Sequence, residues 1–158
     1  MKLLIDSREK WTQPQSKDKH ISGYFERQGI EWEVKKLDYG DYMIENGNIT
    51  IDRKKDLSEV CHNLMLSSDK KRFMNEVRGA KEHGLDFVLL IEHGGKIHSI
   101  EDVKDWKNKY SKVPSVVLMN ALHKLSVQYN VRVEFCPKIS TGRRIIELLQ
   151  NGLTTDDV

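Results

Sequence analysis

The stretch LDYGDYMIENGNITIDRK, residues 37–54, contains two strand-like runs, 41–45 and 48–54, separated by Asn46-Gly47. An Asn-Gly pair between two alternating apolar runs is the strongest short-range signal for a β-hairpin with a two-residue turn. The sequence therefore predicts a β-hairpin over residues 41–54.

A two-residue turn fixes which residues of the hairpin face each other. Counting outward from the turn pairs Asp41 with Asp52, with Cβ atoms roughly 5 Å apart, and places Lys54 one pair further along on the same face. Arg53 falls on the opposite, apolar face. Directly opposed like charges destabilise a sheet, so local stability does not explain the acid pair. A solvent-facing hairpin in which Lys54 compensates two acids is the alternative interpretation.

A bound divalent cation gives the acid pair a chemical reason. Mg²⁺ and Mn²⁺ prefer oxygen ligands, and Mg²⁺ in particular uses one or two carboxylates together with water and substrate phosphate. Such an ion polarises a phosphate, and Lys54 would orient the attacking water or offset charge in the transition state. Asp6 ends another predicted strand and adds a third acid. The pattern indicates phosphodiester hydrolysis with Mg²⁺, for which Mn²⁺ substitutes, and no organic cofactor.

On both sides of the hairpin, predicted strands and helices alternate. The uninterrupted run Phe87–Ile91 is typical of a buried central strand. Capping residues and apolar residues at helical spacing mark the helices. The strands are expected at 2–6, 30–37, 41–45, 48–54, 86–92 and 131–136, and the helices at 17–28, 56–66, 67–83, 99–110, 114–129 and from 140 onward. This order indicates an α/β sandwich with a mixed sheet.

Length and composition set the frame for these elements. A chain of 158 residues with 38% hydrophobic and 32% charged residues fits one domain, expected at 1–150 with a short flexible tail at 151–158. No stretch has the apolar length of a membrane span. Cys61 and Cys136 lack metal-binding spacing, and the N-terminus has no signal-peptide pattern. A cytoplasmic protein of a bacterial or phage-infected cell is expected.

Local basic patches are the candidates for contact with nucleic acid, because the net charge is only +2. One patch opens the predicted helix at 67–83, where it would grip backbone phosphates. The other follows Ser140-Thr141-Gly142, whose amides at a helix start would cradle a phosphate. Solvated helix ends are the alternative for both. The predicted DNA-binding residues are Lys70, Lys71, Arg72, Arg143 and Arg144.

Three ordered motifs, IDSRE at 5–9, LDYGDYMI at 37–44 and IDRK at 51–54, resemble the XPF-type nuclease domain of the PD-(D/E)XK superfamily. The resemblance covers nearly the whole chain. It implies a restriction-endonuclease-like three-layer sandwich, with a mixed central sheet that contains a β-hairpin and helices on both faces. It also implies a metal-dependent endonuclease that cleaves branched DNA such as forks, flaps or Holliday junctions.

The resemblance assigns roles to single residues. Its metal-binding acids fall on Asp41 and Asp52, and its early acid on Asp6, whereas Glu9 ends the early motif with a structural or a catalytic role. The implied site residues are Asp6, Glu9, Asp41, Asp52, Arg53 and Lys54.

Two positions depart from the family pattern. Asp52 stands where the family most often has glutamate, although the wider superfamily uses either acid. Ser58 stands where a trailing aspartate is expected, and this leaves the role of Asp56 open.

Other readings of the same resemblance concern activity and assembly. A catalytically silent DNA-binding or scaffold domain is the main alternative, and a sequence-specific or single-strand nuclease is another. The acids and the lysine favour activity. Because few residues follow the last predicted helix, the resemblance implies a compact, stand-alone form of the kind found in phages and prokaryotes. The helix at 114–129, apolar on more than one face, is either buried or a homodimer contact.

Overall fold

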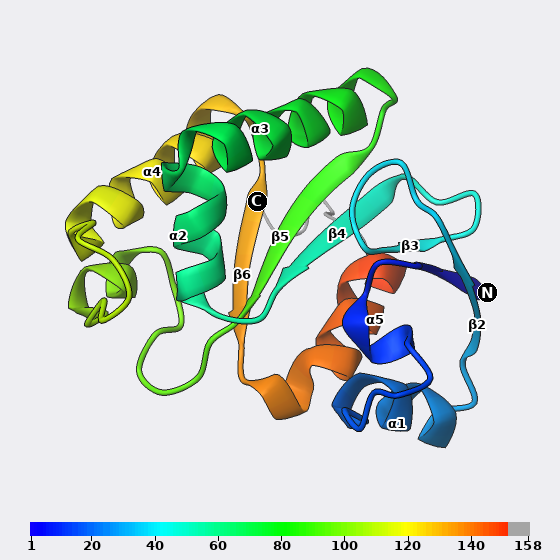
Figure 1. Ribbon diagram of the computed structural model, residues 1–158. Coiled ribbons are helices and arrows are strands. Elements are labelled where there is room, and N and C mark those ends of the chain that lie inside the picture. Colours follow the sequence, from blue (N-terminus) through cyan, green and yellow to red (C-terminus); the bar gives the residue numbers. More distant parts are fainter. Residues whose placement is uncertain (152–158) are drawn as a thin grey trace.

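The structure, a computed structural model, describes residues 1–151 and contains a six-stranded mixed sheet with the strand order β2-β1-β3-β4-β5-β6 (Figure 1). β3 is antiparallel to both of its neighbours, and the other neighbouring pairs are parallel. The strands are β1 (Lys2–Asp6), β2 (Glu31–Lys35), β3 (Tyr42–Ile44), β4 (Ile49–Lys54), β5 (Asp86–Glu92) and β6 (Arg132–Cys136).

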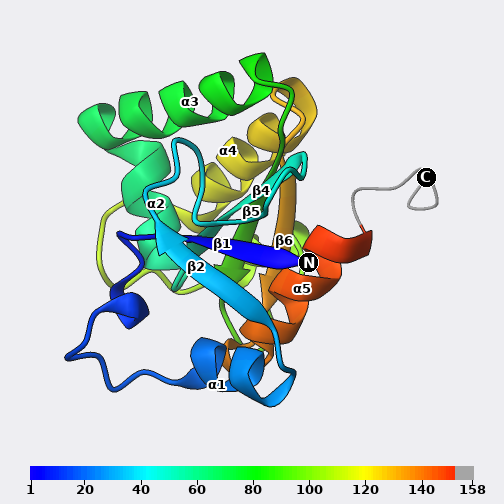
Figure 2. The same cartoon turned by 90° about the vertical axis from the view of Figure 1, so that its right-hand side faces the viewer.

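Helices cover both faces of this sheet. α2, α3 and α4 lie on one face, and α1 and α5 lie on the other (Figure 2). The helices are α1 (His20–Arg27), α2 (Leu57–Met65), α3 (Ser67–Glu82), α4 (Ser115–Gln128) and α5 (Thr141–Asn151), with short 3₁₀ helices η1 (Lys10–Thr12), η2 (Glu101–Asp105) and η3 (Lys138–Ser140). The predicted three-layer α/β sandwich is confirmed.

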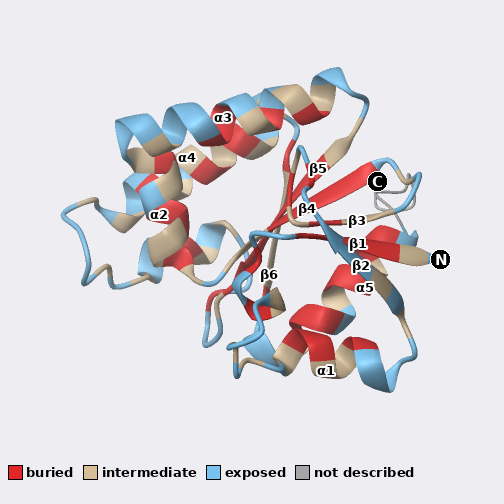
Figure 3. Cartoon of the chain, turned by 45° about the vertical axis from the view of Figure 1, so that its right-hand side comes forward, coloured by how far each residue is buried: buried red, intermediate tan, exposed pale blue. Residues whose placement is uncertain are grey.

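β5 shows why the sequence makes two cores. Side chains alternate across a strand, so Phe87, Leu89 and Ile91 enter the core under α2, α3 and α4, while Val88 and Leu90 enter the core under α1 and α5. All five are at most 1% exposed. The buried residues fill the middle of the molecule in Figure 3. The continuous apolar run therefore has the predicted meaning, a strand covered on both faces.

The hairpin forms with the predicted register but with a different turn. Tyr42 of β3 lies opposite Ile51 of β4, the pair that the predicted register requires, and Asp41, just before β3, lies beside Asp52. The amide of Gly47 donates to the carbonyl of Ile44 at 2.8 Å, so the tight turn is centred on residues 45–46. Asn46 has φ +64°, the left-handed conformation that asparagine tolerates. The predicted turn, centred on Asn46-Gly47, is therefore wrong by one residue.

One predicted helix is wrong. Only the 3₁₀ helix η2 forms within residues 99–110. The apolar residues Ile97, Ile100, Val103 and Trp106 recur every three positions, and all four contribute to the core beneath α2, α3 and α4. A period of three suits a 3₁₀ helix, in which residues i and i+3 lie above one another.

Two further predictions concern the C-terminal tail and membrane-spanning segments. Asn151 ends α5, whereas residues 152–158 of the predicted tail lie outside the described residues. Within residues 1–151, the longest helices are too polar or too short to cross a bilayer.

Candidate active site

A cavity of about 200 Å³ opens beside the hairpin. Its walls come from the segment after β1, from the residue before β3, from β4, and from the start of α2. It is lined by Arg8, Glu9, Lys10, Asp41, Asp52, Arg53, Lys54, Lys55 and Glu59. Five of the six predicted site residues therefore meet here, and Asp6 is not part of the lining.

Asp41 is held at the edge of the sheet by two backbone hydrogen bonds. Its amide donates to the carbonyl of Ile51 at 2.7 Å, and its Oδ2 accepts from the amide of Arg53 at 2.8 Å. The residue before it is Gly40, with φ +74°, and a Cβ there would lie 2.1 Å from Oγ1 of Thr50. The Gly-Asp pair thus brings the backbone close to β4 and directs a carboxylate at Asp52.

The two opposed acids face each other in a buried setting. Burial first, then the charges of Asp52 and Glu9, raise the pKa of Asp41 well above its ordinary value. Asp52 is 5% exposed, and its Oδ2 has no hydrogen-bond partner among residues 1–151. Lys54 Nζ lies 3.1 Å from this atom, but in a direction that makes an ion contact without a hydrogen bond. A buried carboxylate oxygen that accepts no hydrogen bond, beside a second carboxylate, fits a divalent cation.

Lys54 is fixed on three sides. Besides Asp52, its Nζ donates to Oδ1 of Asn63 at 3.2 Å and lies 5.4 Å from the centre of the Phe73 ring. Burial alone would lower the pKa of Lys54, but the charges of Asp52 and Asp41 raise it above its ordinary value. The lysine is therefore a positioned cation. Asn63, on α2, is a site residue that sequence reasoning missed.

Asp6 has its carboxylate occupied by protein donors. Oδ1 accepts from the amide of Leu37 at 2.8 Å, and Oδ2 accepts from Nε of Arg8 at 2.7 Å. The residue is fully buried, and among residues 1–151 no group of three His, Cys, Asp or Glu side chains is placed to hold a metal ion. The carboxylate of Asp6 thus ties β1 to the segment after β2, whereas the two acids that face each other are Asp41 and Asp52.

Arg53 points to the other face of β4 and joins a buried ionic network. Its Nε donates to Oε2 of Glu9 at 2.7 Å, and its Nη1 donates to Oε1 of Glu92. Glu9 also accepts from the hydroxyl of Tyr42, and Glu92 accepts from Oγ1 of Thr141 at 2.9 Å. Glu9 and Arg53 therefore form the wall of the cavity, and their partners join β4 to β5, α5 and the segment after β1.

Asp56, whose role was open, has a structural one. It is the N-cap of α2, and its Oδ1 accepts from the amide of Glu59 at 2.9 Å. This hydrogen bond satisfies one of the free amides of the first helical turn. α2 therefore begins three residues after Lys54, and its second turn supplies Asn63.

Glu76 on α3 is a second residue that sequence reasoning missed. Its Oε1 accepts from the amide of Gly40 at 2.7 Å, next to Asp41. Burial first, then the charge of Asp52, raise the pKa of Glu76. The available signal was an acid three residues after Phe73, beside the apolar stripe of a predicted helix. Packing against α3 thus fixes the segment that carries Asp41.

Replacing Glu76 tests this role. We expect Glu76→Ala to leave the buried amide of Gly40 unpaired and to destabilise the protein by about 1–3 kcal/mol. Glu76→Gln keeps an acceptor at the same place and should stay close to the wild type. Urea unfolding of the two variants and the wild type measures the effect. Equal damage in the two variants would contradict a role through the hydrogen bond.

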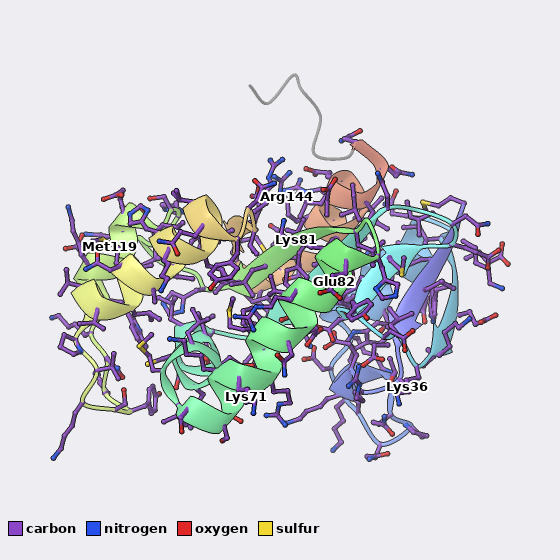
Figure 4. The ribbon with its side chains drawn as sticks, turned by 90° about the horizontal axis from the view of Figure 1, so that it is seen from above. Lys36, Lys71, Lys81, Glu82, Met119 and Arg144 are labelled. Atoms are coloured by element: carbon purple, nitrogen blue, oxygen red, sulfur yellow. The ribbon has the colours of Figure 1, made fainter. Side chains whose placement is uncertain are left out.

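The predicted DNA-binding residues fall on opposite sides of the molecule, as Lys71 and Arg144 show in Figure 4. Lys70, Lys71 and Arg72 form the exposed first turns of α3. Arg143 and Arg144 lie on α5, under the other face of the sheet, and both form ion pairs with Glu147. The start of α5 packs against Tyr24, with Thr141 fully buried, which covers the predicted phosphate cradle.

Comparisons with known proteins bear on this geometry. A family model described as the ERCC4 domain matches residues 5–149. The solved structure of XPF from Aeropyrum pernix is 19% identical, with a TM-score of 0.68 over 96% of this chain and 64% of that chain. XPF from Aeropyrum pernix in complex with DNA is also 19% identical, with a TM-score of 0.67 over 95% and 64%. A search of curated proteins found no match.

The structural likeness confirms the restriction-endonuclease-like fold, and the chain spans about 64% of the length of these XPF structures. The sequence motifs at 5–9, 37–44 and 51–54 lie within or at the start of the matched region. Since the family model covers nearly the whole length, the chain belongs to the ERCC4 domain family and is an XPF-type nuclease domain.

Proposed function

We propose that this protein is a Mg²⁺-dependent endonuclease that hydrolyses phosphodiester bonds in branched DNA. Membership in the ERCC4 family supports a DNA endonuclease. The observation that carries the activity is the buried Oδ2 of Asp52, which has no hydrogen-bond partner among residues 1–151, faces Asp41 and lies 3.1 Å from Lys54 Nζ. A silent scaffold has no need for two facing carboxylates, one of them (Asp41) with a raised pKa, and a fixed lysine.

The residues divide the reaction among them. Asp41 and Asp52 would hold the cation, which when bound supplies polarisation of a phosphate oxygen and activation of water. Lys54, kept charged by the two acids and aimed by Asn63, stabilises the negative charge that develops on the phosphate in the transition state. Its ammonium also orients the attacking water by donating a hydrogen bond. The walls around the cavity limit how much water enters.

Branched DNA and a homodimer are the finer parts of the proposal. DNA is supported by a solved XPF structure that is described as a complex with DNA. On α4, Leu118, Leu122 and Leu125 are buried, so this side of the helix serves the core. Val116 and Val117 are 49% and 44% exposed, and they are the surface we propose for the homodimer.

Cleavage assays with defined DNA structures test the function. Labelled duplex, fork, flap and four-way junction would be incubated with the protein in Mg²⁺, in Mn²⁺ or in EDTA. We expect cleavage of the branched substrates with either metal, none in EDTA, and a loss of at least about 100-fold in Lys54→Ala, because one preorganised charge is removed. Asn63→Ala, which only loosens Lys54, should lose less.

Three outcomes of these assays would contradict the proposed function. Cleavage that persists in EDTA would refute the metal. Equal rates on duplex and on branched DNA would refute the substrate class. A Lys54→Ala variant as fast as the wild type would refute the role of the lysine.

A further inference from the structure

A second cavity, of about 550 Å³, adjoins the candidate active site. It lies between α2, the first turn of α3 and the loop before α4, and it shares Lys55 and Glu59 with the catalytic cavity. The other lining residues are Asp56, Ser58, His62, Asn63, Asp69, Arg72 and Tyr110. Because the two cavities share two lining residues, neighbouring nucleotides of one DNA strand can occupy both of them.

Tyr110 is unusual for its exposure. Its residue is 76% exposed, and among residues 1–151 it is the only Phe, Tyr or Trp in the exposed class. A ring that is mostly exposed in the free protein can bury its apolar faces when a flat ligand stacks on it. Nucleobases are ligands that use such a ring, because every base has a flat face that stacks on it.

The loop that carries Tyr110 is held in one shape. Oδ1 of Asn108 accepts from the amides of Tyr110 and Ser111 at 3.0 and 3.1 Å. Nδ2 of Asn108 donates to Oγ of Ser111 at 2.7 Å and to the carbonyl of Val113 at 3.1 Å. A pre-ordered aromatic loses little conformational entropy when a ligand stacks on it. The loop therefore serves as a fixed platform at the rim of the cavity.

The polar lining suits a nucleotide. Lys55 and Arg72 are cations for a phosphate, and Arg72 has a side chain that is 78% exposed. The acids of the cavity are engaged: Asp69 pairs with Arg72 at 2.7 Å, and Glu59 accepts from the amide of Lys55 at 3.0 Å. Their free lone pairs accept hydrogen bonds from the amino groups of a base.

We propose that this cavity binds one unpaired nucleotide of the DNA strand whose phosphate lies in the catalytic cavity, with its base stacked on Tyr110. A base within a duplex is stacked and paired and cannot enter, so the cavity selects the single-stranded side of a branch point. The inference rests on the proposed function, because it assumes that DNA occupies the catalytic cavity, and it names the structural feature that such DNA must have.

DNA binding in EDTA tests the cavity without cleavage. A splayed fork and a blunt duplex of the same paired sequence carry a fluorescent label, and anisotropy measures their affinity for the whole protein. Tyr110→Ala should bind the fork about tenfold more weakly or worse, with duplex binding unchanged. Tyr110→Phe keeps the ring and should match the wild type. Ile139→Ala, at a site 86% exposed in η3, is the surface control.

Each outcome decides between distinct ideas. A Tyr110→Ala variant that binds the fork like the wild type, or that loses fork and duplex affinity equally, would overturn the cavity assignment. Wild-type protein that binds neither DNA would overturn both this inference and the proposed function. Fork binding that depends on Tyr110, without cleavage in Mg²⁺, would support the cavity and refute the nuclease proposal.

Discussion

Replacing Asp41 with asparagine should abolish Mg²⁺-dependent cleavage and, at the same time, make the metal-free protein more stable at neutral pH. The carboxylate is one of two that would hold the cation, so cleavage should fall by at least about 100-fold. Its raised pKa shows that the folded, metal-free site disfavours the charge. Asparagine removes that charge and still offers an oxygen to the amide of Arg53. We therefore expect Asp41→Asn to unfold at a higher urea concentration than the wild type in EDTA at neutral pH.

The sign of the pH dependence follows from the raised pKa of Asp41. A carboxyl whose folded pKa exceeds its unfolded value favours the folded state while it is protonated, fully so below the ordinary value of 3.8. That contribution is lost as the pH rises through the folded pKa. The advantage of Asp41→Asn should therefore be largest at neutral pH and shrink toward pH 4. Urea unfolding of both proteins in EDTA, from pH 4 to pH 8, measures it.

Asp6→Asn is the matched control, because it makes the same chemical change in a carboxylate with a different environment. Asp6 accepts hydrogen bonds from the amide of Leu37 and from Arg8. One oxygen becomes an NH₂ group facing a donor, so Asp6→Asn should lose about 2 kcal/mol of stability. Adding Mg²⁺ should raise the stability of the wild type and leave Asp41→Asn unchanged. Equal destabilisation of the two variants would contradict the assignment of Asp41 to the metal and Asp6 to the scaffold.

The sequence predicts the site where the chemistry is local and misses it where packing decides. Period-two alternation within one hairpin suffices to place Asp41 opposite Asp52, and the structure has this register despite the shifted turn. Glu76 reaches Gly40 across 36 residues, and its position follows from how α3 packs on the sheet. The periodicity of a helix or a strand cannot predict a contact between residues so far apart in the sequence.

Asp6 shows a different limit. The structure places Asp6, at the end of β1, beside the start of β3, since its amide donates to the carbonyl of Asp41 at 2.8 Å. Whether its carboxylate is free for a metal depends on donors that arrive from elsewhere, here Leu37 after β2. A motif match identifies the residue, but only the hydrogen-bond partners tell whether it binds a ligand or holds the fold.

Arg53 makes this distinction measurable, and its replacement should have the largest effect on stability. Although burial opposes its charge, Glu9 and Glu92 keep the pKa of its guanidinium above the ordinary value. Arg53→Met would leave both acids buried without their cation, which typically costs about 3–5 kcal/mol. Lys2→Met, which breaks the exposed pair with Glu33, should cost less than about 1 kcal/mol. Urea unfolding at pH 7 compares the two.

Removing one of the uncompensated acids as well should restore part of the loss. In Arg53→Met/Glu92→Gln, the side chain at 92 keeps an oxygen for Thr141, and the charge that lost its partner is gone. Recovery of a substantial part of the stability would show that Arg53 acts through the buried network. If Arg53→Met instead folds with nearly full stability but cleaves at least about 100-fold more slowly, the arginine acts on the DNA phosphate. The position of Arg53 next to Lys54 in the motif would then reflect catalysis, and Glu9 and Glu92 would serve to aim it.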